Sequence, residues 1–221
     1  MTFITLLHGW GYDAGLWREV VPLLADYTVD TPDLGFFGKN PALATRRAGP
    51  CSAPHLAVGH SLGALRWLVA EEAAWDALVI INGFPRFTAA DDFPQGVAPR
   101  VLTRMQRRFA QTPAEVLSEF QNACGVPGPP LPADTRPLAQ GLDFLATADG
   151  RTCLAQRLKD IHILASRDDG IVPAALSEAA FAALPAAQMH WCDSGNHALP
   201  LTRPQDCAAL IRAVAAGLSQ R

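Results

Sequence analysis

The chain has 221 residues, of which 49% are hydrophobic and 18% charged, and its formal net charge is −3. This length and composition are typical of one globular domain with a substantial core. The slight acidic balance argues against a nucleic-acid partner, and no window holds the roughly 18 consecutive apolar residues that a membrane span requires.

The apolar N-terminal stretch 1–7 lacks basic residues and continues directly into the sequence His8-Gly9-Trp10-Gly11. We therefore expect a core strand there rather than a signal peptide, and a cytoplasmic protein. An odd number of cysteines without C-x-x-C spacing favours buried thiols over disulfides or zinc ligands. We also find no phosphate loop, dinucleotide-binding glycine motif or metal-ligand spacing, so we expect no cofactor and no metal. The cysteines are Cys51, Cys124, Cys153, Cys192 and Cys207.

Short apolar runs alternate with helical patterns along the chain, which predicts an α/β fold with a mostly parallel sheet of about six strands flanked by helices. The expected strands are residues 3–7, 27–30, 56–58, 78–82, 161–165 and 188–192. The expected helices around them are residues 16–24, 62–74, 174–183 and 205–218.

From residue 84 to residue 152 the pattern is helical without intervening strands. Helices inserted after the fourth predicted strand suggest a lid, with residues 1–83 and 153–221 forming the core. Thr112-Pro113-Ala114-Glu115 predicts a capping box that begins a helix ending before Gly125, and a further helix is expected near 138–147. Segment 98–110 carries four arginines and no acid.

The segment Gly59-His60-Ser61-Leu62-Gly63 matches G-x-S-x-G between a predicted strand and a predicted helix. In this context the sharp turn exposes the serine hydroxyl above the sheet edge, and the glycines avoid clashes with the strand and helix. The alternative is a glycine-rich turn with an incidental serine. We predict that Ser61 is a nucleophile.

A serine nucleophile needs a base and an orienting acid. His197 lies in a loop after the last predicted strand. The other five histidines lie in or beside strands, in the turn of residues 59–63 (the elbow) or in the first loop. Asp169 is the expected acid, because it begins the loop Asp-Gly-Ile-Val-Pro, and the neighbouring Asp168 is its rival. The order Ser61, Asp169, His197 is that of an α/β-hydrolase triad. The alternative for His197 is an ordinary surface-loop histidine.

The developing oxyanion needs backbone donors. The N–H of Leu62, directly after the nucleophile, should be one donor. The second is expected from the loop after the first strand, where Trp10 is placed to supply it.

These motifs resemble the α/β-hydrolase superfamily over nearly the whole chain, and most of all the pimeloyl-acyl-carrier-protein methyl ester carboxylesterases of biotin synthesis. The stretch Phe87-Thr88-Ala89-Ala90-Asp91-Asp92-Phe93-Pro94 looks like the entry to that family's lid. The resemblance implies a serine carboxylesterase that hydrolyses a methyl ester on acyl carrier protein. It also implies substrate contacts by Trp10, Leu62, Phe120, Gln121, Asn122, Ala123 and Cys124.

The lid segment offers one independent argument for a ligand beneath it. Val116, Leu117, Phe120 and Cys124 fall on one helical face, which fits either an acyl chain or plain packing of the lid on the body. Family lids also present arginines to the acidic carrier protein. Here the matching helix carries acids, so Arg104, Arg107, Arg108 and Arg136 would have to substitute, unless they form an ordinary solvated basic face. The chain departs from the family in segment 38–54, which is short and contains prolines, so we expect the helix that is usual there to be reduced or absent.

The leading hypothesis is therefore a serine carboxylesterase acting on a small or carrier-bound acyl ester. The same triad would also serve a general short-chain carboxylesterase, a thioesterase or an acyltransferase, since the sequence does not show the acyl acceptor. A non-catalytic binding protein with a hydrolase fold is the alternative from another class.

Overall fold

The computed structural model describes residues 2–38, 53–70, 75–132 and 134–220, so the prediction for segment 38–54 lies almost entirely outside the described residues. Six strands form one sheet in which every pairing is parallel, in the order β2-β1-β3-β4-β5-β6. The predicted strands are confirmed. They are β1 (Phe3–Leu7), β2 (Thr28–Asp30), β3 (His55–His60), β4 (Ala77–Ile81), β5 (Ile161–Ser166) and β6 (Met189–Cys192).

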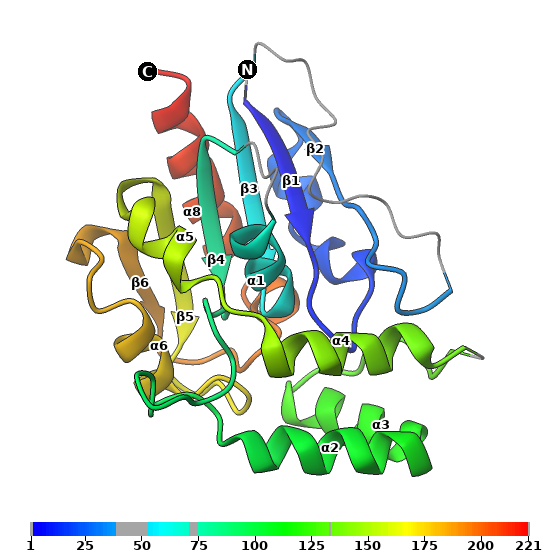
Figure 1. Cartoon of the computed structure of the whole chain (residues 1–221). Helices are drawn as coiled ribbons and strands as arrows, with labels where there is room; N and C mark the ends of the chain where they lie inside the picture. The colour runs from blue at the N-terminus through cyan, green and yellow to red at the C-terminus, as the bar shows by residue number, and fades with distance from the viewer. Residues whose placement is uncertain (1, 39–52, 71–74, 133, 221) are drawn as a thin grey trace.

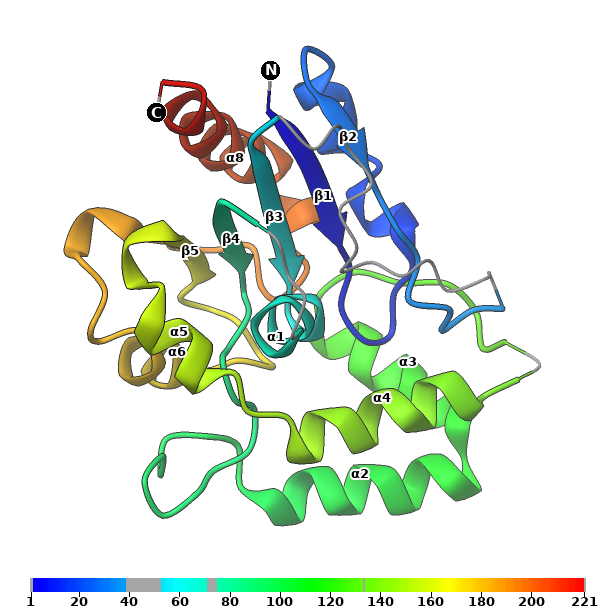
Figure 2. The same cartoon turned by 45° about the horizontal axis from the view of Figure 1, so that its top comes forward.

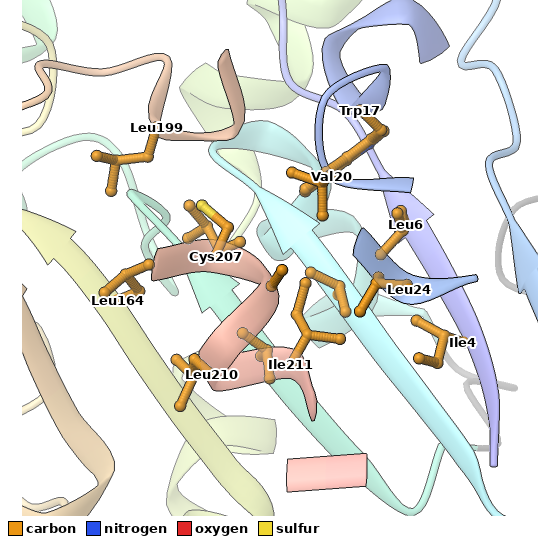
Figure 3. Close-up of a cluster of buried hydrophobic side chains, with 14 of the residues drawn as sticks. Ile4, Leu6, Trp17, Val20, Leu24, Leu164, Leu199, Cys207, Leu210 and Ile211 are labelled. Atoms are coloured by element: carbon orange, nitrogen blue, oxygen red, sulfur yellow. The ribbon is translucent and has the colours of Figure 1, made fainter. Parts of the chain in front are cut away.

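Both faces of the sheet are covered, and the central strands are buried on both sides. Side chains of β4 alternate, with Val79 facing one core cluster and Ile80 the other. Helix α8 (Pro204–Leu218) packs on the first face through Cys207 and Ile211 (Figure 3). Helices α1 (Leu62–Val69) and α5 (Arg151–Gln156) cover the other face (Figure 1). Burial on both faces explains the continuous apolar runs in the sequence.

Some predicted helices differ in extent. Residues 16–24 do not form one helix but two short 3-10 turns, Ala14–Trp17 and Val21–Leu24. Pro22 lacks the amide hydrogen that a continuous helix would need at that point. Helix α1 ends at Val69, because Ala70 is extended, and residues 71–74 lie outside the described residues. Helix α5 and the short helix α7 (Leu199–Thr202) were not predicted from the sequence. Helix α6 (Ala174–Ala180) was predicted and is present.

Before α5, the described part of the segment between β4 and β5 carries three helices, α2 (Pro99–Gln111), α3 (Pro113–Ala123) and α4 (Arg136–Thr147). They lie together beyond the carboxyl ends of the strands (Figures 1 and 2). The two ends of the insertion meet, since Arg86 Nη1 lies 2.8 Å from Asp149 Oδ2 and the Gly150 N–H donates to Pro85 O at 2.7 Å. This layout fits a lid over residues 84–152.

The predicted capping box at Thr112 is wrong. Its hydroxyl donates to the Arg108 carbonyl at 3.4 Å and makes no capping bond to α3. The reason is that Thr112 both ends α2 and begins α3, so its hydroxyl serves the end of the first helix. The predicted stop after this helix is confirmed, because Gly125 adopts a φ of 82°.

Candidate active site

Ser61 stands between the end of β3 and the start of α1, at the carboxyl edge of the sheet. Its backbone has a φ of 53° and a ψ of −122°, a conformation that non-glycine residues rarely adopt. Its N–H donates to Ile81 O on the neighbouring strand at 3.1 Å. The strained turn therefore has the strand-turn-helix context in which a nucleophilic serine is presented.

The glycines around Ser61 are dictated by close backbone contacts. A Cβ on Gly59 would lie 2.4 Å from Ala64 Cα, and one on Gly63 would lie 2.4 Å from the Leu7 carbonyl oxygen. Both contacts are with backbone atoms, which have little room to move. The elbow thus packs as tightly against its neighbouring strand and helix as its glycine spacing predicts.

We expect Gly63→Ala to lower the free energy of unfolding by about 1–3 kcal/mol, because the added methyl group overpacks this contact. Gly217→Ala is the matched control, since a Cβ there meets nothing within 4 Å. In the exposed part of α8 it should raise stability by about 0.5–1 kcal/mol. Urea unfolding of both variants measures the difference. Equal stabilities would show that the elbow tolerates a side chain at residue 63.

Asp169 and His197 form a buried pair at the ends of the next strands. His197 Nδ1 lies 2.7 Å from Asp169 Oδ2, and the two side chains are 0% and 1% exposed. The other carboxylate oxygen of Asp169 accepts the backbone N–H groups of Ile171 at 2.7 Å and Val172 at 2.8 Å. These bonds fix the carboxylate so that one oxygen faces the imidazole. The structure therefore brings together the acid and base expected from the sequence.

The second imidazole nitrogen of His197, Nε2, is buried and makes no hydrogen bond with the described residues. Because Nδ1 donates its proton to Asp169, Nε2 is the nitrogen that can accept one. Ser61 and His197 also lie close to a common neighbour, His60, whose ring centroid is 4.8 Å from that of His197. The ring of His197 thus has the tautomer that a general base for a serine hydroxyl requires.

The main chain of His197 is held by two buried side chains that the sequence analysis did not single out for this role. His60 Nε2 donates to the His197 carbonyl at 2.9 Å, and Asn82 Nδ2 donates to the same oxygen at 2.9 Å. Burial first, and then the electrostatic influence of the neighbouring His197 ring, holds the pKa of His60 well below its ordinary value. His60 therefore stays neutral and keeps its donor role. Asn82, directly after β4, has a φ of 43°, a conformation that asparagine tolerates better than most residues.

Asp168, the rival acid, does not contact His197 but bonds to the loop that carries it. Its carboxylate accepts the Ser166 hydroxyl at 2.5 Å, the Asn196 N–H at 2.8 Å and the Gly195 N–H at 3.3 Å. The Ser166 hydrogen bond, with these backbone donors, holds the pKa of Asp168 below its ordinary value. The geometry thus favours Asp169 as the triad acid.

The loop after β1 approaches the elbow closely. A Cβ on Gly9 would lie 2.9 Å from Ser61 Cβ, so the His8–Gly11 loop passes directly beside the nucleophile. Leu62 is the first residue of α1, and its N–H therefore has no acceptor within the helix. The N–H groups of Trp10 and Leu62 remain our prediction for the oxyanion hole.

A cavity of about 180 Å³ adjoins Ser61 on the side of the helical insertion. Trp10 contributes to its wall, and its ring packs edge-on against Phe120 at a centroid distance of 4.8 Å. The remaining wall is almost wholly apolar and comes mainly from the insertion, through Phe84, Phe87, Val97, Val101, Leu102, Met105, Leu142 and Leu145. Such a cavity suits an aliphatic chain.

Of the lid residues expected to contact substrate, the structure brings only Phe120 to this cavity. Gln121 is buried and donates to Gly11 O at 3.0 Å and Pro129 O at 2.9 Å, so its amide fastens the lid to the first loop. Asn122 and Ala123 are exposed, and Cys124 is buried in the core cluster on the α8 face. Successive helical residues point about 100° apart, which is why one α3 segment cannot line the cavity throughout. Leu62 is buried beside the elbow but does not line the cavity either.

The apolar face of α3 mostly serves packing of the lid on the body. Val116 and Leu117 are 3% and 2% exposed and belong to the cluster that contains Trp10. The end of α3 also meets the loop that carries His197, because the Ala198 N–H donates to Cys124 O at 3.4 Å. On this face of α3, Phe120 is the residue whose side chain lines the cavity and could contact a ligand.

Within the described residues, no group of His, Cys, Asp and Glu side chains is placed to hold a metal ion. No helix in this part of the chain has the length and apolar character of a membrane span. The four cysteines that the structure describes are all free thiols, and three of them are buried.

The sequence of the chain matches the model of the alpha/beta hydrolase family over residues 6–210. The chain belongs to this family. Among solved structures, an esterase from Exiguobacterium antarcticum superposes on this hydrolase with a TM-score of 0.78, at 16% identity, covering 98% of this chain and 92% of that one. That similarity supports the fold.

Two curated relatives are more similar in sequence. The pimeloyl-[acyl-carrier protein] methyl ester esterase of Aromatoleum aromaticum is 31% identical, with 97% of this hydrolase and 98% of the relative covered. The biotin biosynthesis bifunctional protein BioHC of Cellvibrio japonicus is 29% identical over 95% of this chain, which spans only 46% of that protein. The hydrolase is thus similar to esterases of this kind over almost its full length.

Proposed function

We propose that this hydrolase is a serine carboxylesterase that cleaves the methyl ester of a pimeloyl group attached to acyl carrier protein. The observation that carries the proposal is the buried contact of 2.7 Å between His197 Nδ1 and Asp169 Oδ2, at the same sheet edge as the strained turn of Ser61. The substrate is proposed from the similarity to the pimeloyl-[acyl-carrier protein] methyl ester esterase of Aromatoleum aromaticum.

In the proposed reaction, His197 Nε2 takes the proton of Ser61 as the hydroxyl oxygen attacks the ester carbonyl. The N–H groups of Trp10 and Leu62 stabilise the resulting oxyanion. His197 then returns the proton to methanol as the ester bond breaks, and an acyl-enzyme remains. A water molecule, deprotonated by His197, hydrolyses this intermediate and releases the free carboxylate and Ser61.

The acyl chain has an apolar route to the surface. The cavity at Ser61 shares Val101, Met105, Phe120 and Ile171 with a neighbouring cleft that opens between α2 and α3. The rim of this cleft carries Arg104 and the ion pair of Arg108 with Glu119, whose closest atoms are 2.7 Å apart. A chain that leaves the cavity by this route emerges on the arginine-rich side of the lid.

This side supplies a docking surface for an acidic carrier protein. Arg108 is paired with Glu119, and Arg136 is paired with Asp134. Arg100, Arg104 and Arg107 of α2 are exposed and form no ion pair with the described residues. Of the four arginines named in the sequence analysis, Arg104 and Arg107 are therefore available to a partner, and Arg100 joins them.

The substrate proposal is tested by comparing kcat/KM for pimeloyl-carrier-protein methyl ester with kcat/KM for short nitrophenyl esters. A strong preference for the carrier-bound ester, with release of methanol, supports the proposal. Equal rates indicate a general short-chain esterase. Release of the carrier thiol in place of methanol identifies a thioesterase.

We expect the double variant Arg104→Glu/Arg107→Glu to raise KM for the carrier-bound ester about tenfold and to leave hydrolysis of nitrophenyl esters unchanged. The reason is that two attractive contacts with an acidic partner become repulsive, and rim charges act mainly on association. Arg18→Glu, on an exposed side chain outside the lid, is the matched control. The KM difference should shrink at high salt, since exposed charges are screened. An unchanged KM would place the carrier elsewhere.

A further inference from the structure

Two loops at the carboxyl edge of the sheet bind each other reciprocally. The acid loop, residues 167–172, follows β5, and the base loop, residues 193–198, follows β6. The acid loop offers the Asp168 carboxylate, which accepts the Gly195 and Asn196 N–H groups at 3.3 and 2.8 Å. In return, Asn196 Oδ1 accepts the Gly170 N–H at 3.1 Å. Each loop therefore holds the backbone of the other.

These same bonds reach the triad. Asn196 Oδ1 also accepts the N–H of His197 at 2.8 Å, so one carboxamide oxygen joins the residue after the acid to the base itself. The Asp168 carboxylate is anchored to the sheet by the Ser166 hydroxyl at the end of β5. A continuous chain of hydrogen bonds thus runs from the strand end through Asp168 and Asn196 to the main chain of His197.

The backbone of the base loop needs such support. Gly195 has a φ of 137° and Asn196 a φ of 55°, both outside the region that most residues prefer. Residues in such conformations persist where the surrounding structure over-determines them. Neither residue contacts the cavity, so substrate binding does not account for the bonds.

We infer that Asp168 and Asn196 are positioning residues that lock the acid loop to the base loop and so set the contact between His197 and Asp169. The inference rests on the triad of the proposed function but not on its substrate. Asp168 is therefore more than a solvated neighbour of the acid. It acts on His197 indirectly, by binding the backbone of the loop that carries this histidine.

The test compares Asp168→Ala and Asn196→Gly with the wild type on a short nitrophenyl ester. Glycine at residue 196 allows the positive φ and keeps the backbone N–H, while the side-chain bonds are lost. We expect each variant to lower kcat about ten- to a hundredfold with little change in KM, since small misplacements of a catalytic group have effects of this size. The kcat of the double variant should be no lower than that of the less active single variant, because both changes act on one contact.

Proton NMR supplies a readout that a purely structural role would not change. The imidazole N–H of His197 bonded to Asp169 should give a downfield resonance, and this resonance should shift or broaden in both variants at temperatures where they remain folded. Asp193→Asn is the matched control, because this carboxylate on the same loop is 99% exposed and its contact with the acid loop is a solvent-exposed ion pair with Arg167 at 3.8 Å, a kind of pair that contributes little. It should keep both the wild-type kcat and the resonance.

An unchanged kcat and an unchanged resonance in folded Asp168→Ala would overturn the inference. If that variant does not fold, Asp168→Asn takes its place, since its remaining oxygen keeps an acceptor for part of the network. The NMR comparison is valid even if the wild type hydrolyses no ester. A failure of the proposed substrate is therefore distinguishable from a failure of the lock.

Discussion

Ser61→Ala should lower kcat by roughly a millionfold, the size of effect seen when a serine nucleophile is removed from an intact triad. The variant loses the covalent step itself, while the cavity and the Asp169–His197 pair remain. Folding should be unaffected, because the Ser61 hydroxyl forms no hydrogen bond with the residues that the structure describes. Turnover of a nitrophenyl ester, with circular dichroism to check the fold, measures both.

Ser118→Ala provides the matched control, since Ser118 is an exposed serine on α3. It should retain the wild-type rate. A fluorescent organophosphonate should label the wild type once per chain, at Ser61, and should not label Ser61→Ala. Retained hydrolysis or labelling in Ser61→Ala would show that another group is the nucleophile. Absence of labelling in the wild type would instead favour a non-catalytic binding protein.

Asp169→Asn should lower kcat about ten-thousandfold, as expected when the tautomer of the base is reversed. The Ile171 and Val172 N–H groups both bind the Oδ1 position, so an asparagine would keep its oxygen there. Its NH2 group would then face His197 Nδ1, which must accept a hydrogen bond and lose its proton. The proton moves to Nε2, and the imidazole can no longer take one from Ser61.

The effect should be largest on kcat, since residue 169 does not line the cavity. Asp193→Asn makes the same chemical change on an exposed carboxylate and should cost nothing. A full loss of activity in an Asp168→Asn variant, together with an active Asp169→Asn variant, would reverse the assignment of the acid. The ratio of the two rates is therefore a direct test of the geometry.

The sheet and the triad order were predictable from the sequence because they depend on local patterns. Buried parallel strands read as short apolar runs, and the elbow glycines have a strict steric reason. The hydrogen-bonding roles of Asn82 and Asn196 were not predictable in the same way. Their partners lie on other strands and loops, so the sequence around them shows only polar residues near strand ends.

In the helical insertion, the sequence predicted a helix but not the contacts of its individual side chains. A helical face on α3 was visible, but whether each residue meets the body, the solvent or a ligand depends on how α3 lies against its neighbours. Phe120 lines the cavity, whereas Gln121 is fastened to the first loop. A resemblance to a family therefore predicts that a helix is present more reliably than it predicts where each of its side chains points. The 3-10 turns near Pro22 similarly needed the tertiary context.

The all-parallel sheet also has a consequence for folding. Ser61, Asp169 and His197 follow three different strands, β3, β5 and β6, and pairing of parallel strands joins segments far apart in the chain. Such long-range contacts form slowly compared with local helices. During refolding from denaturant, the far-ultraviolet helical signal should therefore return before ester hydrolysis does. The recovery of turnover should report the completed sheet, and we expect no turnover from a fragment that ends before residue 197.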